Sequence, residues 1–402
     1  MPHSDQLRLI PVRGALSRTL LVVPVALALA FAWYAARWYV GDFVAEFAPQ
    51  MGEGQLEAAE EAARLAPDDP WTHWVIAGLR KRNFMPEDLN EAVRQYEEAV
   101  RLSPYDYRFW IDLGRTREEV GDVVGGEKAL RRAVELAPYY AYTHWYLGNL
   151  LLRAGRSEEA FAELRRAAEA NTQLRPQLFN VAWTLYGQDV EAIRKMVADT
   201  PAARAEFATY LVGRGRVDDA LALWSTLNSA EKKEASEASQ AIMRSLLSQK
   251  RYRVALAVLS DTKSGIDPKA SQFINGGFED DINAQAGTPF SWQIKTDPQA
   301  QIAVDEGTRH SGARSLRIFF RATEPLAFNN VSQTVVVEPS TQYRLEFYIR
   351  AEDLKSAANP VIVILDAMDG ATPLGISQPA PSGTYDWQPV TINFTAPPKT
   401  EA

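Results

Sequence analysis

The sequence predicts a multidomain α + β chain with an N-terminal transmembrane helix, an α-solenoid of helical repeats and a C-terminal antiparallel β-sandwich. Three observations predict these parts. Residues 19–39 form one apolar run, a spacing of 34 residues recurs within residues 50–262, and short alternating runs replace the helical pattern over residues 268–402. Residues 1–18 remain as a tail before the apolar run.

The apolar run is long enough to cross a bilayer. A spanning helix needs about 20 mostly apolar residues, and residues 20–36 contain no charged side chain. Asp42 and Glu46 follow the run, and three arginines precede it: Arg8, Arg13 and Arg18. This arginine bias predicts a cytoplasmic tail over residues 1–18 and places residues 43 onward on the other side of the membrane.

A cleaved signal peptide is the alternative interpretation. Ala28-Leu29-Ala30 and Ala30-Phe31-Ala32 both match the small-residue pattern of a cleavage site, and cleavage would leave a free extracytoplasmic protein. A belt of aromatic residues favours an anchor at a membrane interface. Its members are Trp33, Tyr34, Trp38 and Tyr39.

Composition excludes several classes of protein. The chain of 402 residues contains no cysteine, which excludes disulfides and cysteine-ligated zinc. The net charge of -8 repels phosphate backbones, so nucleic acid is not an expected partner.

Small residues and prolines recur along the repeat region with a period of 34. Gly114 and Gly148 keep this spacing, as do Pro104 and Pro138. Two antiparallel helices approach closely where Gly or Ala lies at their crossing, and proline ends the second helix. The period predicts stacked pairs of helices.

These positions resemble the tetratricopeptide repeat in three consecutive units. The first carries Trp74, Gly78, Ala92, Tyr96, Ala99 and Pro104, with two extra residues near 83–87. The second carries Trp110, Leu113, Gly114, Leu130, Ala133 and Pro138. The third carries Leu147, Gly148, Ala160, Leu164 and Ala167, but has His144 where Trp is usual and Thr172 where Pro is usual.

Incomplete repeats flank these three units. Residues 56–67 repeat a second-helix pattern and form a half-unit next to the apolar run. Residues 176–198, 202–227 and 237–259 read as degenerate helix pairs.

The tetratricopeptide resemblance implies a superhelix whose concave groove binds segments of protein. If the units keep the family register, the first helices turn six residues toward this groove. They are Arg108, Ile111, Arg115, Tyr142, Trp145 and Asn149. The alternative for Tyr142 and Trp145 is packing between helices.

The C-terminal region contains five clear strand patterns separated by turn residues. They cover residues 315–320, 331–337, 342–350, 361–366 and 387–394. Several short antiparallel strands predict a sandwich or jelly roll.

This region resembles the carbohydrate-binding modules that accompany plant-polysaccharide hydrolases. The motifs that carry the resemblance are Asn275-Gly276-Gly277-Phe278-Glu279, Trp292, His310-Ser311-Gly312-Ala313-Arg314-Ser315-Leu316-Arg317, Tyr343 to Arg350 and Asp386-Trp387-Gln388. The resemblance implies a jelly roll with Trp292 and Trp387 in its core. It also implies one further strand beyond Ala402, without which a sheet edge stays open to another chain.

One face of the predicted sheet has the chemistry that sugars require. Strand alternation places Tyr348 and Arg350 opposite the core-facing side chains of residues 343–349. Aromatic planes pack on the C–H faces of pyranoses, and charged or amide groups bond their hydroxyls. The glycan-binding candidates are Arg317, Phe319, Gln333, Tyr348 and Arg350. The alternative is that they are ordinary solvent-facing strand residues.

The sequence offers little for catalysis or cofactors. None of the four histidines has a metal-binding spacing, and no P-loop, dinucleotide fingerprint or nucleophile elbow occurs. We therefore expect no enzyme and no cofactor. Some relatives of the carbohydrate-binding modules hold a structural calcium near the first strand, and Glu279 and Asp280 are the corresponding candidates here.

Together these parts predict a single-pass protein of the bacterial inner membrane with its bulk in the periplasm. We expect it to bind a membrane complex or polysaccharide-assembly proteins through its repeats and a glycan through its jelly roll, in the assembly or export of a cell-surface polysaccharide. The alternative is a non-catalytic structural subunit of a membrane complex that binds no sugar.

Overall fold

The computed structural model describes residues 14–263, 271–282, 288–321, 328–356 and 358–402. It consists of two compact units, Met1–Ala182 and Trp183–Ala402. Most of the predicted tail, residues 1–13, and the first residues of the predicted sandwich, 268–270, lie outside the described residues.

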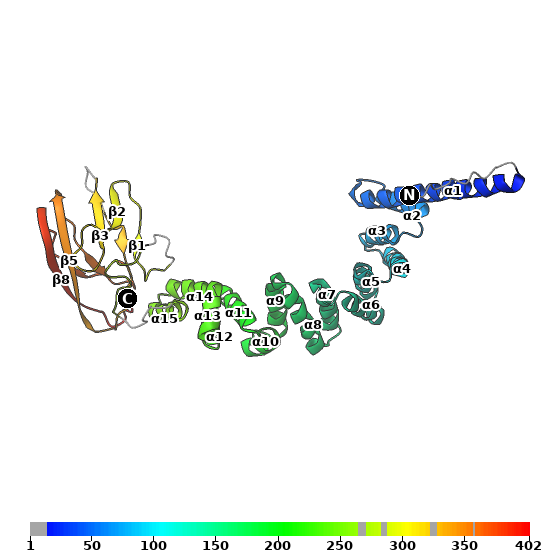
Figure 1. Cartoon of the computed structure of the whole chain (residues 1–402). Helices are drawn as coiled ribbons and strands as arrows, with labels where there is room; N and C mark the ends of the chain where they lie inside the picture. Colours follow the sequence, from blue (N-terminus) through cyan, green and yellow to red (C-terminus); the bar gives the residue numbers. More distant parts are fainter. Residues whose placement is uncertain (1–13, 264–270, 283–287, 322–327, 357) are drawn as a thin grey trace, which may run out of the picture. The chain divides into compact units, whose positions relative to one another are not determined.

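The first unit begins with a long helix, α1 (Ala15–Phe47), which contains Pro24. Among the residues described, Val22–Gln50 is the one helical stretch long and apolar enough to cross a membrane. None of the 18 residues of its most apolar segment is buried. This agrees with the predicted apolar helix, and α1 continues well past residue 39. Figure 1 shows its N-terminal part extending beyond the helices that follow.

The C-terminal part of α1 supplies the first helix of a repeat. It packs on α2 (Gln55–Leu65), the predicted half-unit, around a core that contains Ala45 and Ala62. Arg37 donates from Nε to the Leu65 carbonyl at 2.8 Å and from Nη2 to the Arg64 carbonyl at 2.7 Å. These bonds satisfy backbone acceptors at the end of α2, which would otherwise lack partners. The predicted half-unit is therefore the second helix of a complete hairpin, whose first helix is the C-terminal part of α1.

Three regular hairpins and the start of a fourth complete the first unit (Figure 1). The helices are α3 (Pro70–Lys81), α4 (Pro86–Leu102), α5 (Tyr107–Glu119), α6 (Val123–Leu136), α7 (Ala141–Arg153), α8 (Ser157–Ala170) and α9 (Arg175–Leu185). Aspartates cap several of them: the side chains of Asp69, Asp106 and Asp122 accept backbone N–H bonds in the first turns of α3, α5 and α6.

Glycine sets the distance between the helices of a hairpin. A Cβ on Gly148 would lie 2.7 Å from Leu164 Cγ and 3.0 Å from the Ala160 carbonyl. Gly114 has the same surroundings, 2.7 Å from Leu130 Cγ and 3.0 Å from the Gly126 carbonyl. Both glycines confirm the predicted crossing positions.

In the hairpin of α3 and α4 the predicted crossing residue, Gly78, is wrong by one position. Ala77 is fully buried with Ala92 and Tyr96, whereas a Cβ on Gly78 would meet nothing closer than the Tyr96 hydroxyl at 3.8 Å. Ala77 lies 37 residues before Gly114, so this unit has three extra residues rather than two. They lengthen α4 at its N-terminus, beginning at Pro86.

A recurring hydrogen bond gives the same alignment of the repeats with one another. In three units a ring N–H donates to a carbonyl six residues earlier: His73 to Pro67 at 3.0 Å, Trp110 to Pro104 at 2.9 Å and His144 to Pro138 at 2.8 Å. His73, not Trp74, therefore corresponds to Trp110. The indole of Trp74 instead donates to Asp112 Oδ2 of the next unit at 2.8 Å.

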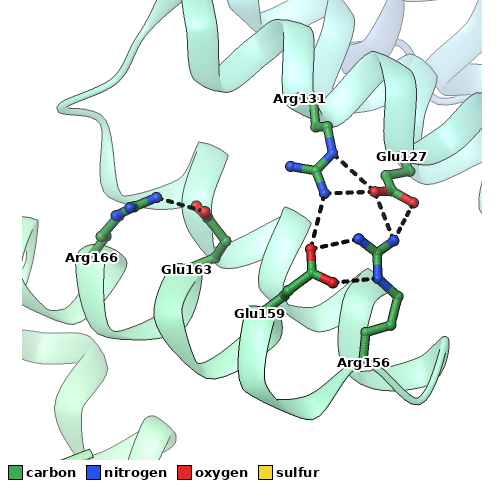
Figure 2. Close-up of polar contacts among 6 residues, drawn as sticks. All are labelled: Glu127, Arg131, Arg156, Glu159, Glu163 and Arg166. Atoms are coloured by element: carbon green, nitrogen blue, oxygen red, sulfur yellow. Dashed lines mark hydrogen bonds and ion pairs between the residues drawn. The ribbon is translucent and has the colours of Figure 1, made fainter.

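Ion pairs join the second helices of successive units, as Figure 2 shows. Arg156 contacts Glu127 at 2.8 Å and Glu159 at 2.5 Å, and Arg131 contacts Glu127 at 2.7 Å and Glu159 at 3.5 Å. These side chains are exposed to solvent, which screens the attraction, so the pairs add little to stability. The network gives α6 and α8 a charge-matched contact.

The second unit continues with paired helices. They are α10 (Val190–Val197), α11 (Pro201–Gly213), α12 (Val217–Ser225), the short α13 (Ser229–Glu234), α14 (Ser236–Ser248) and α15 (Tyr252–Thr262). The pairs α11/α12 and α14/α15 match the predicted degenerate units. Helix α13 was not predicted; it begins with a capping box between Asn228 and Glu231.

The described part of the C-terminal region contains eight strands in four antiparallel pairs. The pairs are β1 (Gln293–Ile294) with β4 (Val331–Ser332), β2 (Ala300–Asp305) with β3 (Ser315–Phe320), β5 (Gln342–Leu354) with β8 (Gly383–Thr395), and β6 (Val363–Leu365) with β7 (Pro373–Ile376). Over the described residues these pairs do not join into two continuous sheets. The region predicted as a jelly roll therefore consists of small antiparallel sheets (Figure 1). The predicted strand 331–337 is regular only at its first two residues.

Polar bonds connect α15 to the strand region within the second unit. The Tyr252 hydroxyl donates to the Ala367 carbonyl at 3.0 Å, and Arg253 Nη2 donates to the Val337 carbonyl at 2.9 Å. The Arg253 backbone N–H donates to the Glu401 carboxylate at 3.2 Å. The first turn of α15 thus contacts the strand region directly.

The crossing positions give a first prediction. Gly148→Ala adds a methyl group against Leu164 and should lower the free energy of unfolding by about 1–2 kcal/mol, because overpacking outweighs the gain in helix propensity. Gly78→Ala meets only an ordinary van der Waals contact with the Tyr96 hydroxyl and should raise the free energy of unfolding by up to about 1 kcal/mol. Denaturant unfolding followed by circular dichroism measures both; equal effects of the two substitutions would contradict the corrected register.

A second prediction concerns the buried pair of His144 and Glu163, whose side chains lie 2.6 Å apart. Both ring nitrogens of His144 face acceptors, and the hydrogen bond to Glu163 raises the pKa of His144. Burial raises the pKa of Glu163, but the bond to His144 and the charge of Arg166 outweigh burial and hold it below its ordinary value. The charged pair therefore stabilises the repeats in the acidic to neutral range.

The His144 contribution is complete below its ordinary pKa of about 6.5 and is lost as pH rises through the raised value. We expect the unfolding midpoints of the unsubstituted protein and of His144→Gln to differ more at about pH 6 than at about pH 9. Denaturant titrations at both pH values measure this difference. His73→Gln, at the equivalent position of an earlier repeat, is the matched control. A difference independent of pH would show that the pair is not charged.

Candidate functional site

The pair of strands β5 and β8 presents one face to solvent. Side chains alternate along β5 as predicted: Leu345 and Phe347 turn inward, and Tyr348 and Arg350 turn outward. The regular register ends at Ile349, which lies opposite Gln388. A bulge follows, and it brings residues 386 and 387 beside Arg350.

An aromatic cluster lies at this bulge. The imidazole of His310 stacks on the ring of Tyr348, with centroids 3.7 Å apart and planes 14° apart, and meets the indole of Trp387 edge-on at 5.9 Å. Arg350 Nε lies 3.8 Å from the Asp386 carboxylate. We name these five residues the His310 cluster. Tyr348 remains 48% exposed, so the cluster offers aromatic surface beside a charged donor and an acceptor.

The loop between β2 and β3 holds His310 in place. The Ala313 backbone N–H donates to both oxygens of Glu279, at 3.1 and 3.0 Å. Gly312 has a φ of +69°, and a Cβ there would lie 1.9 Å from Glu279 Oε1, so only glycine fits. Arg314 pairs with Asp281 at 2.7 Å. The motif that resembles carbohydrate-binding modules therefore shapes the loop that carries His310.

Two of the predicted sugar ligands form a separate group on β3. Arg317 lies 3.4 Å from Asp305, and the guanidinium of Arg321 lies 5.7 Å from the ring of Phe319. Within the described ranges, no hydrogen bond, ion pair or ring contact joins Arg317 or Phe319 to Tyr348 or Arg350. The predicted ligand set thus divides between two places.

Gln333 and the two predicted core tryptophans have distinct surroundings. Gln333 is half-buried and donates from Nε2 to the Ile274 carbonyl at 2.8 Å, which is a structural role. Trp292 packs between Phe273 and Phe278, with centroids 5.7 and 5.0 Å away. Both tryptophans are half-buried and not in a fully buried core, and the ring of Trp387 contacts His310.

The proposed calcium ligands take part in backbone bonds. Glu279 binds the Ala313 N–H, and the backbone N–H of Asp280 donates to Asn275 Oδ1 at 3.0 Å. Over the residues that the structure describes, no group of three or more His, Asp or Glu side chains could hold a metal ion. A calcium bound by Glu279 and Asp280 stays a prediction.

A row of tyrosines lies on the first helices of two repeats. Ring centroids are 5.1 Å apart between Tyr107 and Tyr140, 5.7 Å between Tyr140 and Tyr142, and 6.3 Å between Tyr142 and Tyr146. The guanidinium of Arg115 lies 4.5 Å from the Tyr146 centroid, within cation–π range. We name these five residues the tyrosine row. It connects α5 to α7 and includes the predicted groove residues Arg115 and Tyr142.

The other predicted groove residues are not part of the tyrosine row. Ile111 is only 7% exposed and was wrongly placed in the groove, because its repeat position faces the neighbouring unit, as Trp74 does. Arg108 pairs with Asp106 at 2.6 Å. Trp145 is half-buried, and its carbonyl accepts a bond from Asn149 Nδ2 at 2.8 Å.

Sequence reasoning missed His310 in the cluster and Tyr107, Tyr140 and Tyr146 in the row. The bulge that brings His310 to Trp387 leaves no mark in the strand alternation. The tyrosines did leave a signal: Pro104 and Pro138 are each followed by a tyrosine-rich run, Tyr105-Asp106-Tyr107 and Tyr139-Tyr140-Ala141-Tyr142.

Comparison with known proteins agrees with this division of the chain. Residues 270–402 match the family model of a carbohydrate binding domain. The C-terminal resemblance predicted above is confirmed.

Two curated proteins are similar to parts of the chain. Protein O-mannosyl-transferase TMTC1 of Mus musculus is 37% identical over 87 residues, 21% of this chain and 9% of that protein. Interferon-induced protein with tetratricopeptide repeats 2 of Cricetulus griseus is 23% identical over 167 residues, 42% of this chain and 33% of that protein. The chain thus spans about a tenth and a third of the length of these relatives.

Solved helical-repeat structures are also similar. A crystal structure of MamA is 14% identical with a TM-score of 0.30, covering 54% of this chain and 96% of that one. YrrB, described as a TPR protein with an unusual peptide-binding site, is 18% identical with a TM-score of 0.27, covering 51% of this chain and 91% of that one.

A third prediction tests the loop that positions His310. Gly312→Ala should distort residues 306–314 and speed tryptic cleavage at Arg309, because the added methyl group overlaps the Glu279 carboxylate. Gly307→Ala is the matched control in the same loop, where a Cβ would lie 3.3 Å from Asp305 Oδ1. Mass spectrometry of a timed digest measures both; equal cleavage rates would mean that Glu279 does not fix the loop.

Proposed function

We propose that this chain is a membrane-anchored, non-catalytic adaptor that binds a glycan through its C-terminal domain and proteins through its helical repeats. The observation that carries the proposal is the His310 cluster, an exposed aromatic surface with an adjacent Arg350 and Asp386 on a domain of the carbohydrate-binding type. Aromatic planes and charged groups beside them are what sugar rings and hydroxyls require.

The proposed site differs from the ligand set expected from sequence. Tyr348 and Arg350 remain its centre, and His310 and Trp387 join them. Arg317 and Phe319 on β3 are a second exposed pair that a longer glycan chain would reach. Gln333 supports the backbone and contacts no sugar in this proposal.

The tyrosine row supports the protein-binding half of the proposal. Tyrosine combines a large apolar ring with a hydroxyl that can bond a peptide backbone, and it is enriched with arginine at protein interfaces. The row lies on the first helices of neighbouring repeats, the positions from which such arrays bind protein segments.

The apolar part of α1 supports anchoring. In this proposal α1 crosses the bacterial inner membrane with its N-terminus in the cytoplasm, and the repeats and the sugar-binding domain lie in the periplasm. An anchor, a protein-binding array and a sugar-binding domain in one chain suit the assembly or export of a cell-surface polysaccharide. The competing proposal is a structural subunit of a membrane complex in which no sugar is bound.

The fourth prediction separates these two proposals. The protein should bind one or more polysaccharides on a glycan array, and Tyr348→Ala and Arg350→Ala should each weaken binding by roughly tenfold or more, since stacking and charged hydrogen bonds each contribute about 1–3 kcal/mol. Arg344→Ala is the matched control, because Arg344 lies on the same face of β5 but pairs with Glu346 away from the cluster.

Circular dichroism confirms that each variant is folded. If no form binds any glycan, the structural-subunit proposal takes precedence. If binding survives in both cluster variants but is lost in Phe319→Ala, the sugar binds on β3 and the His310 cluster is not the site.

A further inference from the structure

Helix α1 has a second apolar face outside its predicted span. One side of its C-terminal part packs on α2 through Arg37, Gly41 and Ala45, and the last two are fully covered. A neighbouring side, about a quarter to a half turn around the helix, carries Val40, Phe43 and Phe47, which are 48%, 51% and 43% exposed. The rings of Phe43 and Phe47 contact each other at 4.7 Å.

This face has the spacing of a coiled-coil seam. Residues that alternate at intervals of four and three form one apolar stripe along α1, and two helices that share such a stripe pack into a left-handed coiled coil. The seam consists of Val22, Ala26, Leu29, Trp33, Ala36, Val40, Phe43 and Phe47, all of them exposed. Within the apolar run this spacing says little, because every side chain there is apolar.

Beyond the apolar run the spacing becomes informative. Arg37, Asp42 and Glu46 interrupt the apolar sequence, yet none of them falls on the seam. An isolated end of a helical array normally presents a polar outer face, since nothing stacks on it. Here the outer face of the first hairpin is apolar, so something covers it.

The bilayer is too thin to cover this part of the seam. Helix α1 is continuous to Phe47, eight residues past the predicted end of the span at Tyr39, which is about 12 Å along the axis. The headgroup layer extends only about 5–8 Å from the hydrocarbon core on each side. An average tilt of about 20° shortens the rise by less than a tenth. Phe47 therefore lies in water unless a protein helix covers it.

We propose that the seam binds α1 of a second copy of this chain, forming a parallel two-helix coiled coil that continues from the membrane to Phe47. The inference rests on the membrane anchoring proposed above, which makes the α1 helices of two copies emerge side by side in the same direction. Their seams are then identical and in register, as a symmetric pair requires.

The flanking residues permit this pairing. In a parallel pair the positions beside the seam meet across the interface, and Tyr39 would face Val44 of the second copy while Ala32 would face Arg37. No like charges meet there. Small residues alternate with large ones along the seam, so Ala36 leaves room beside Trp33. Helix α2 lies on the Arg37 and Gly41 side, and Val44 packs on the core of its own hairpin, while Val40, Phe43 and Phe47 stay exposed.

Single cysteines test the pairing, because the natural chain contains none. Val40→Cys and Phe43→Cys in the full chain, oxidised in native membranes, should give disulfide-linked dimers. Ala35→Cys and Asp42→Cys lie off the seam and should give at least about tenfold less dimer. Adding Phe47→Glu to Val40→Cys should reduce its dimer by a similar factor, since a buried unpaired carboxylate is strongly disfavoured. Phe47 is exposed in the single chain, so this substitution leaves the hairpin folded.

Alkaline extraction of the same membranes separates failure of the anchor from failure of the seam. Protein that leaves the membrane on extraction overturns the anchor and this inference with it. Protein that stays in the membrane but forms no dimer at residues 40 and 43, or forms equal dimer at all four positions, overturns the pairing alone. A crosslinked product containing a different protein shows that the seam binds another helix and also overturns it.

Discussion

The close approach of paired helices at small residues governs the helical part of this protein. At Gly41, Gly114 and Gly148 a single added methyl group would lie within 3 Å of atoms of the facing helix. Because the two axes are that close, the bulky side chains beside each crossing fill the space between successive pairs. The ring-to-carbonyl bonds of His73, Trp110 and His144, and the ion pairs that join α6 to α8, depend on this spacing. The tyrosine row depends on it too, since its rings come from neighbouring pairs.

In the C-terminal domain a different constraint brings the functional residues together. No single strand contains the His310 cluster: Tyr348 comes from β5, Trp387 from a bulge in β8, and His310 from a loop between two other strands. The loop keeps its shape through one carboxylate, Glu279, and one glycine, Gly312. Residues outside the cluster thus hold the loop that carries His310.

Much of this architecture could be predicted from sequence because it depends on periodicity. The 34-residue spacing identified Gly114 and Gly148, and strand alternation gave the outward direction of Tyr348 and Arg350. The sequence pattern pointed to Gly78, and only the packing of Ala77 against Ala92 and Tyr96 shows that the crossing lies one residue earlier. His310 could not be found, because a bulge and a loop bring it to Tyr348, and neither has a periodic signature. Gln333 has a polar side chain suited to sugars, but its bond to Ile274 depends on a backbone path that no local pattern encodes.

The position of Arg37 has a consequence for the life of the protein in the cell. The α1 residues that hold α2, namely Arg37, Gly41 and Ala45, lie downstream of the small-residue sites that end at Ala30 and Ala32. A protease that cut at either site would remove the first 12 or 14 residues of the apolar run and leave Arg37 in place at the end of α2. If the apolar run anchors the chain as proposed, such a cut would release the array into solution without refolding it.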